Sequence, residues 1–170
     1  MALLTLPVVA SAGQSLYRGD SSGVEITYDD AQWKASELLS YPYFTCIAPD
    51  CDSDSCLVVT SLDPDFAKWP ETIDKASLDA LDGTFLAYEK SGGHEAEIVD
   101  PTRALTIGGR EMLVSVIRYK LTGFDFLSSK YVFRDAGDTR IVTCEGLQES
   151  LTALKSRIEA LIGAIKFTPR

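Results

Sequence analysis

Histidine is nearly absent from this sequence, which contains one, His94, among 170 residues. Serine and cysteine hydrolases usually depend on a histidine base, so such an activity would have to use His94. This residue lies in a polar segment that follows a predicted helix, SGGHEAE, and we interpret it as a surface residue. No G-x-S-x-G motif is present. The sequence favours a binding role over catalysis, and the open alternative is a small hydrolase or other enzyme using His94 or paired carboxylates.

Positive charge is also scarce, because 16 lysines and arginines stand against 25 acidic residues, for a formal net charge of −9. Nucleic-acid binding needs a basic face, which this balance disfavours. Attraction to an anionic membrane surface is disfavoured for the same reason. The general interpretation of the acidic charge is solubility. The more specific interpretation is a basic protein partner or a cation.

Long apolar runs are missing as well: none reaches the roughly 18 residues that span a bilayer, so we expect no membrane insertion. The first residues, MALLTLPVVASA, are mostly apolar and end in the small residues that signal peptidase prefers. We interpret residues 1–12 as the remnant of a signal peptide, with cleavage before Gly13, although a basic segment is missing. The alternative is an N-terminal strand or arm. Residues 13–170 are then a single domain, periplasmic or secreted.

Cysteines are concentrated in one segment, CIAPDCDSDSC, which holds Cys46, Cys51 and Cys56, while Cys144 lies far away. No C-x-x-C motif occurs, so a thioredoxin-type redox site is excluded and a zinc site is disfavoured. An even number of cysteines in an exported protein indicates two disulfides. Three pairings are open. We favour one local bond within the segment and one long-range bond to Cys144.

The same segment has aspartates at alternate positions, Asp50, Asp52 and Asp54, as at the start of an EF-hand loop. The glycine and the glutamate that such a loop requires are replaced by Ser55 and Ser61. The sequence therefore excludes an EF-hand. A weak calcium contact is the alternative to a solvated acidic turn, which we favour, and we expect no cofactor.

The spacing of apolar residues predicts strands near residues 23–30, 38–47 and 56–62, followed by a helix over residues 73–89. Gly108-Gly109 and Ala136-Gly137 each separate two alternating segments and predict two hairpins. An amphipathic helix is predicted over residues 147–165. This order predicts an α+β fold, with a mostly antiparallel sheet of about six to seven strands covered by helices.

Two aromatic segments are candidate partner-binding surfaces. The first contains Tyr41 and Tyr43, and the second contains Phe66 and Trp69. Exposed tyrosine and tryptophan are common anchors in interfaces. The alternative, which we favour, is that these side chains pack inside the domain and staple the start of the following helix.

Several segments resemble the PsbP-like superfamily, which includes a photosystem extrinsic subunit, a Ran-binding nuclear-transport protein and many bacterial secreted proteins. The resemblance covers residues 23–167 and rests on GVEITYDDAQW, LTIGGREMLVSVIRYK, KYVFRDAGDTRIVTCEG and the final AIKF. The three-cysteine segment is not part of the pattern, and no functional residue of the family can be carried over. The resemblance implies binding or assembly more than catalysis.

Taken with the predicted export, these features indicate a non-catalytic binding or accessory protein of the cell envelope with an unknown protein partner. A periplasmic inhibitor or immunity protein is a further alternative, in which the acidic charge would face a basic enzyme.

Overall fold

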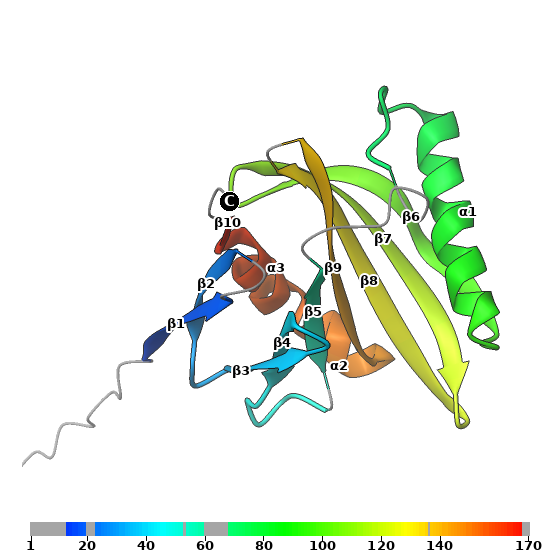
Figure 1. The fold of residues 1–170 in the computed structure, drawn as a ribbon. Helices are drawn as coiled ribbons and strands as arrows, with labels where there is room; N and C mark the ends of the chain where they lie inside the picture. The colour runs from blue at the N-terminus through cyan, green and yellow to red at the C-terminus, as the bar shows by residue number, and fades with distance from the viewer. Residues whose placement is uncertain (1–12, 20–22, 53, 60–67, 136, 168–170) are drawn as a thin grey trace, which may run out of the picture.

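The computed structural model describes residues 13–19, 23–52, 54–59, 68–135 and 137–167. A seven-stranded antiparallel sheet forms the centre of the molecule (Figure 1). One long helix lies on one side of it, and two short helices and a three-stranded sheet lie on the other. The α+β class and the mostly antiparallel sheet are thus confirmed. The interpretation of residues 1–12 concerns a part of the chain outside the described residues.

The large sheet has the strand order β3-β4-β5-β9-β8-β7-β6. Its strands are β3 (Trp33–Leu38), β4 (Tyr41–Cys46), β5 (Ser55–Val59), β6 (Ala96–Ile107), β7 (Arg110–Leu121), β8 (Phe124–Asp135) and β9 (Asp138–Leu147). The small sheet has the order β1-β2-β10, with β1 (Gln14–Gly19), β2 (Val24–Asp29) and β10 (Ile165–Phe167). The expected strand over residues 38–47 is wrong at its start, because Leu39 and Ser40 have positive φ and form the β3–β4 turn.

The hairpin predicted at Gly108-Gly109 is confirmed, because both glycines have positive φ (59° and 78°) between β6 and β7. Side chains rarely adopt this conformation, so glycine is favoured at both positions. Gly108 has a second constraint: a Cβ there would lie 2.6 Å from the Cα of Gly163. The hairpin therefore packs closely against the C-terminal part of the chain.

The predicted helix between the two halves of the sheet is α1 (Lys75–Ser91). It begins at a capping box, in which Asp74 accepts a hydrogen bond from the Ser77 backbone and the Ser77 side chain accepts one from the Asp74 backbone. Its inner side carries Leu81 and Phe85, both buried against the large sheet. The capping box explains why the helix begins two residues later than the apolar spacing alone predicts.

The amphipathic helical segment predicted at the C-terminal side, over residues 147–165, is confirmed, but it is not one continuous helix. The chain forms α2 (Gln148–Ala153) and α3 (Lys155–Gly163), which meet at Leu154, where ψ is near zero. Residues 165–167 then extend as β10 and pair with β2. The predicted apolar stripe is nevertheless buried, because both short helices direct it toward the large sheet: Leu151, Leu154, Ile158, Leu161 and Ile162. Within the described residues, no helix has both the length and the apolar character that a membrane crossing requires.

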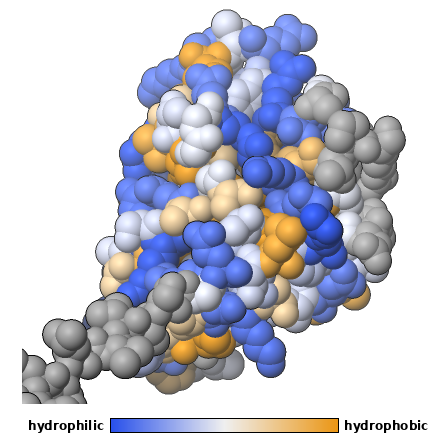
Figure 2. All heavy atoms as spheres, turned by 90° about the vertical axis from the view of Figure 1, so that its left-hand side faces the viewer, coloured by the Kyte–Doolittle hydropathy of each residue, from blue (hydrophilic) through white to orange (hydrophobic). Residues whose placement is uncertain are grey.

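Two apolar cores lie on opposite faces of the large sheet. The smaller joins α1 to β7, β8 and β9. The larger joins the other face to the small sheet, α2 and α3 and includes Trp33, Phe44 and Phe133. On the face that turns toward the viewer in Figure 2, hydrophilic residues predominate and apolar residues form small separate groups.

Candidate binding groove at the disulfide loop

The four cysteines form two disulfides, one local and one long-range, the arrangement favoured above among the three open pairings. Cys46 is bonded to Cys51, five residues away, and Cys56 to Cys144, 88 residues away. Cys56 and Cys144 are directly paired in the β5–β9 ladder. The segment between β4 and β5, which we call the disulfide loop (residues 46–56), is therefore closed on itself and tied to the centre of the sheet.

A buried carboxyl group fixes the disulfide loop from inside. Asp54 is fully buried, and its Oδ2 accepts hydrogen bonds from the Ser150 hydroxyl and, at 3.2 Å, from the Asp52 backbone. Its Oδ1 has no hydrogen-bond partner among the described residues and lies against Gly146, where a Cβ would clash with it. Burial raises the pKa of Asp54, and the hydrogen bonds oppose this only in part. The loop is thus attached to the start of α2.

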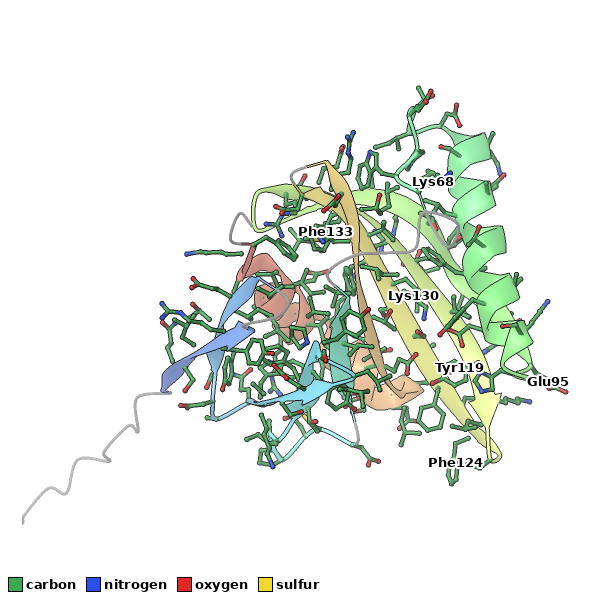
Figure 3. All side chains as sticks on the ribbon, viewed as in Figure 1. Lys68, Glu95, Tyr119, Phe124, Lys130 and Phe133 are labelled. Atoms are coloured by element: carbon green, nitrogen blue, oxygen red, sulfur yellow. A yellow bond between two sulfur atoms is a disulfide. The ribbon has the colours of Figure 1, made fainter. Side chains whose placement is uncertain are left out.

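A groove of about 890 Å³ opens beside this loop, and we call it the acidic groove. Three segments that are far apart in the sequence line it. They are the disulfide loop, the tip of the β7–β8 hairpin and the start of α2: Pro49, Asp50, Cys51, Asp52, Phe124, Asp125, Leu147, Gln148, Glu149, Ser150 and Ala153. Figure 3 shows Phe124 at the end of the β7–β8 hairpin.

All four charged residues that line the acidic groove are acidic: Asp50, Asp52, Asp125 and Glu149. Their side chains are exposed. Asp50 is paired with Arg157 Nη1 at 2.7 Å, and this hydrogen bond lowers the pKa of Asp50. Among the described residues, the other three carboxylates have no ion pair within 4.0 Å. The groove therefore presents negative charge that the protein itself does not neutralise.

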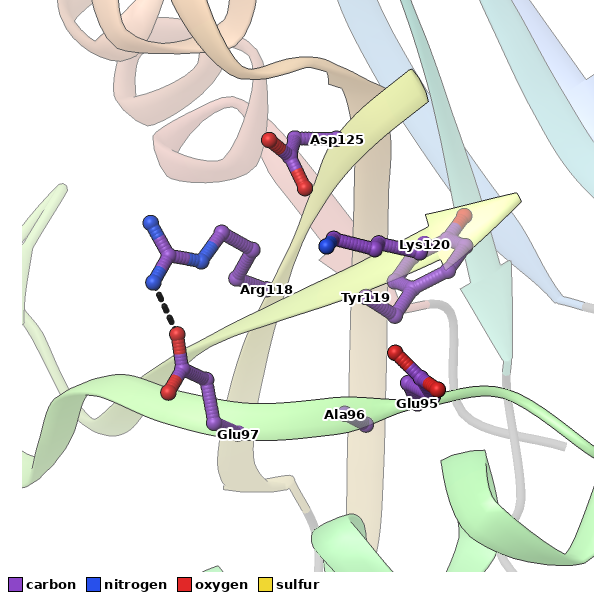
Figure 4. A pocket seen from close by; sticks show the side chains of 7 residues that line it. All are labelled: Glu95, Ala96, Glu97, Arg118, Tyr119, Lys120 and Asp125. Carbon is purple, nitrogen blue, oxygen red and sulfur yellow. Dashed lines mark hydrogen bonds and ion pairs between the residues drawn. The ribbon is translucent and has the colours of Figure 1, made fainter. Parts of the chain in front are cut away.

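Two smaller hollows lie nearby. The first, of about 370 Å³, meets the acidic groove at Asp125 and has charges of both signs, with an Arg118–Glu97 ion pair across it (Figure 4). The second, of about 200 Å³, lies between the large sheet and α2 and α3. Tyr131 lines this second hollow, and burial raises its pKa to about 12. Of the three, only the acidic groove has charged residues of a single sign.

His94, the residue on which a histidine-dependent enzyme would rely, belongs to a partly buried network. Its Nδ1 lies 3.4 Å from Glu89 Oε2, and its ring stacks on Tyr119 with centroids 5.0 Å apart. Glu89 is paired with Lys130 at 2.9 Å, and both are buried. The interpretation of His94 as a plain surface residue is therefore wrong, because the turn after α1 folds its ring onto the sheet. The contacts of His94 with Glu89 of α1 and with Tyr119 of β7 hold α1 on the sheet.

Three of the aromatic residues singled out in the sequence are described, and none of these three lines the acidic groove. Tyr41 and Tyr43 are half-buried on β4. Trp69 is half-buried and packs against both cores, and its backbone N–H donates to Thr139 Oγ1 at 3.2 Å. For Trp69, this position matches the alternative in which the side chain packs inside the domain. Phe66 lies outside the described residues.

The three aspartates of the disulfide loop point to different partners. Asp50 binds Arg157, Asp54 is buried against Ser150, and Asp52 lines the groove. Consistent with this, no group of three or more histidine, cysteine, aspartate or glutamate side chains that could hold a metal occurs in the described part of the chain. The high density of cysteine and aspartate was the one sequence signal for this region. Nothing in the sequence indicated that Phe124 or Glu149 belongs to it.

The chain has a PsbP-like fold. It is similar to cyanobacterial PsbP (CyanoP) from Synechocystis sp. PCC 6803, with a TM-score of 0.58, 12% sequence identity and coverage of 96% of this chain and 98% of that one. It is also similar to LpqN of Mycobacterium tuberculosis, described as involved in cell envelope biogenesis, with a TM-score of 0.54, 14% identity and coverage of 92% and 91%. These likenesses concern the fold alone.

A third similar structure is PA94 from Pseudomonas aeruginosa, a protein of unknown function described as a putative regulator, with a TM-score of 0.50 and 13% identity. The alignment covers 92% of this chain and 97% of PA94. By sequence, no protein-family model and no curated protein matches the chain. The similar structures thus show the fold of this chain and not its function.

Proposed function

We propose that this protein is an exported, non-catalytic accessory protein of the cell envelope that binds a protein partner through the acidic groove. The observation that carries the proposal is the groove itself, which is open, lined by three separate segments and edged by a covalently closed loop. A preformed surface loses little conformational freedom on binding, which favours affinity.

The two disulfides support export. Disulfides form and persist in oxidising compartments such as the periplasm and are rare in the cytosol. The apolar N-terminal segment with its small-residue end supports the same conclusion, with a mature protein that begins near Gly13. LpqN, one of the similar structures, is described as involved in cell envelope biogenesis, which is compatible with an envelope role for this chain.

The arrangement around His94 supports a non-catalytic role. The ring lies against Glu89 and Tyr119, and the carboxylate of Glu89 also faces Lys130. A general base must reach a proton of a bound substrate. Here the base candidate is directed into the junction between α1 and the sheet, and none of the three hollows includes His94 in its lining.

An inhibitor or immunity protein is a second candidate, which the unpaired carboxylates of the acidic groove favour. Such a protein would bind a basic enzyme, so it is a special case of partner binding. An inhibitor differs from other partner-binding proteins in one measurable respect: addition of the purified chain would reduce the activity of the partner enzyme.

The test has two parts, both on the full chain in its own cells. Cell fractionation and N-terminal sequencing should place the protein outside the cytoplasm with its first residue near Gly13. A photo-crosslinking amino acid is then placed at one position at a time: Gln148 in the groove, Leu39 at the β3–β4 turn and Ala87 on α1, all exposed. We expect a discrete adduct with one envelope protein from Gln148. Cytoplasmic protein without adducts at any position would reject the proposal.

A further inference from the structure

We infer that the acidic groove binds a basic segment of the partner, with lysine or arginine side chains among the carboxylates and an apolar side chain against Phe124. This inference rests on the proposed function and specifies the chemistry of the partner. It combines three observations: the sign of the charge, an exposed apolar anchor and a frame that is cross-linked by a disulfide and hydrogen bonds.

The charge in the groove is unbalanced. Asp52, Asp125 and Glu149 come from three different segments, and each is exposed without an ion pair among the described residues. Lys120 lies opposite Asp125 in the β7–β8 ladder, and both line the neighbouring hollow, but no ion pair within 4.0 Å joins these two residues. Like charges held at one place raise the local concentration of oppositely charged ligands and accelerate their association. A segment with two or three positive charges complements this arrangement.

The apolar anchor is the tip of the β7–β8 hairpin. Phe124 is 62% exposed, and Leu121, its partner across the ladder, is 43% exposed. The tip is built by Thr122 and Gly123, both with positive φ, which is the geometry of a tight hairpin turn. Exposed aromatic side chains beside polar groups are frequent anchors in interfaces. An apolar residue of the partner segment would therefore cover Phe124.

The frame around these groups is held from several sides. The Cys46–Cys51 disulfide closes the loop, and Asp54 attaches it to Ser150 at the start of α2. The groove is thus bordered by regular structure and by a covalently closed loop. A lone divalent cation would need several oxygens on one centre, but Asp50 is already paired with Arg157 and Asp54 is directed inward. A peptide segment, which spreads its charges along the groove, matches the separated carboxylates better.

The inference can be tested with a defined probe. This is a synthetic seven-residue peptide in which lysine alternates with leucine and phenylalanine, and its control has glutamate in place of lysine. Both are titrated into the oxidised full chain while backbone amide signals are followed by NMR. We expect the lysine peptide alone to shift signals of residues around Asp52, Phe124 and Gln148, and binding to weaken about tenfold between low salt and about 0.5 M NaCl, because opposite charges are screened.

Two charge variants distinguish the effect of the groove carboxylates on binding from the effect of the overall net charge. The groove variant is Asp52→Asn, Asp125→Asn and Glu149→Gln. The control variant changes the net charge equally at exposed acids that do not line the groove: Glu71→Gln, Asp79→Asn and Glu111→Gln. We expect the groove variant to bind the lysine peptide at least tenfold more weakly, and the control variant less than twofold more weakly. Equal losses in both variants, or shifts centred elsewhere, would overturn the inference.

The crosslinking experiment distinguishes failure of the inference from failure of the proposed function. In cells, the adduct from Gln148 should be lost in the groove variant and kept in the control variant. An adduct that persists in the groove variant would leave partner binding through the groove intact and overturn the basic-segment inference alone. An adduct that forms only from Leu39 would place the partner elsewhere and overturn the groove as the binding surface as well. Melting curves of both variants establish that they are folded.

Discussion

Lys130 Nζ lies 2.9 Å from Glu89 Oε1, and the two side chains are only 4% and 5% exposed. The pair joins the last turn of α1 to β8, near the middle of the large sheet (Figure 3). Within the described part of the chain, no hydrogen bond of acceptable geometry reaches Oε1, so the contact is an ion pair without that additional support. A buried pair of this kind contributes little net stability, but the loss of one partner is costly because it leaves an unpaired buried charge.

The first prediction follows from this pair. Lys130→Met should lower the free energy of unfolding by about 3–5 kcal/mol, because the Glu89 carboxylate then stays buried without a cation. The double variant Glu89→Leu/Lys130→Met should recover most of this loss. Urea denaturation monitored by fluorescence measures both. A double variant as unstable as the single one would contradict the explanation.

The exposed pair Arg118–Glu97 offers a matched control for the buried one. Arg118→Met removes a cation from a salt bridge whose partners are 39% and 57% exposed. Water solvates the remaining carboxylate, so we expect a loss of about 1 kcal/mol or less.

The second prediction concerns the two disulfides. In the chain-entropy model, the Cys56–Cys144 bond, with a separation of 88 residues, stabilises the fold by about 4–5 kcal/mol, and the Cys46–Cys51 bond by about 2 kcal/mol. The paired variant Cys56→Ser/Cys144→Ser should therefore melt at a much lower temperature than Cys46→Ser/Cys51→Ser. Thiol titration of the unfolded, unreduced protein should count close to zero. Four reactive thiols in protein from its native compartment would contradict the prediction.

The third prediction concerns the pH dependence that Asp54 introduces. Burial raises its pKa in the folded state above the ordinary value for an aspartate, so the folded protein holds this proton more tightly than the unfolded chain. The ionised group destabilises the fold at pH 7, and this effect fades as the pH falls through the raised pKa. Asp54→Asn should thus be more stable than the wild type at pH 7, by about 1 kcal/mol.

The measurement for Asp54 is a series of melting curves from pH 7 to pH 4. The advantage of Asp54→Asn over the wild type should shrink steadily as the pH falls. Glu149→Gln, in which an exposed groove carboxylate is changed, serves as the control and should show no such trend. An advantage that grows toward low pH would have the wrong sign for a raised pKa.

The fourth prediction separates the two hairpin glycines. Gly109→Ala adds a methyl group with no atom within 4 Å and should cost about 1–2 kcal/mol for the positive φ alone. Gly108→Ala adds the same backbone cost and a clash with Gly163, so a further 1–3 kcal/mol is expected from overpacking. Replacement of both glycines by valine should destabilise the fold more than either. Equal melting temperatures for the two alanine variants would show that Gly163 moves aside without cost.

The fifth prediction concerns His94. His94→Ala removes the stack on Tyr119 and should cost about 0.5–1.5 kcal/mol. The adduct from Gln148 and the location of the protein should not change. Loss of biological function in a stably folded variant, measured by rescue of a deletion strain, would favour the enzyme alternative.

The parts of the fold that sequence reasoning predicted are those with local chemical signals. Gly108-Gly109 indicated a hairpin because few other residues adopt positive φ, and the apolar spacing of α1 indicated its buried side. Thr122-Gly123 is a weaker turn signal than two consecutive glycines, so the hairpin between β7 and β8 was not predicted. The break at Leu154 was missed for a different reason. A stripe of apolar residues has the same spacing in one helix as in two short helices that follow each other.

The acidic groove could not be predicted, because its three segments are brought together by the pairing of strands over long distances. The density of cysteine and aspartate indicated that the disulfide loop is unusual. The positions of Phe124 and Glu149 beside this loop depend on the β5–β9 and β8–β9 registers, which no local pattern contains. Trp69 is the opposite case. Its polar segment made it a candidate for an exposed binding surface, but the side chain is half-buried and packs against both apolar cores.

The pairing of β10 with β2 has a consequence for the order in which the chain folds. Ile165 lies opposite Ile26, so the small sheet is complete only when the last part of the chain is in place. A hairpin of two strands, such as β1–β2 alone, is marginal in water. Contacts between such distant residues also slow folding. We therefore expect the consecutive hairpins from β6 to β9 to form first, and the pairing of β10 with β2 to form last.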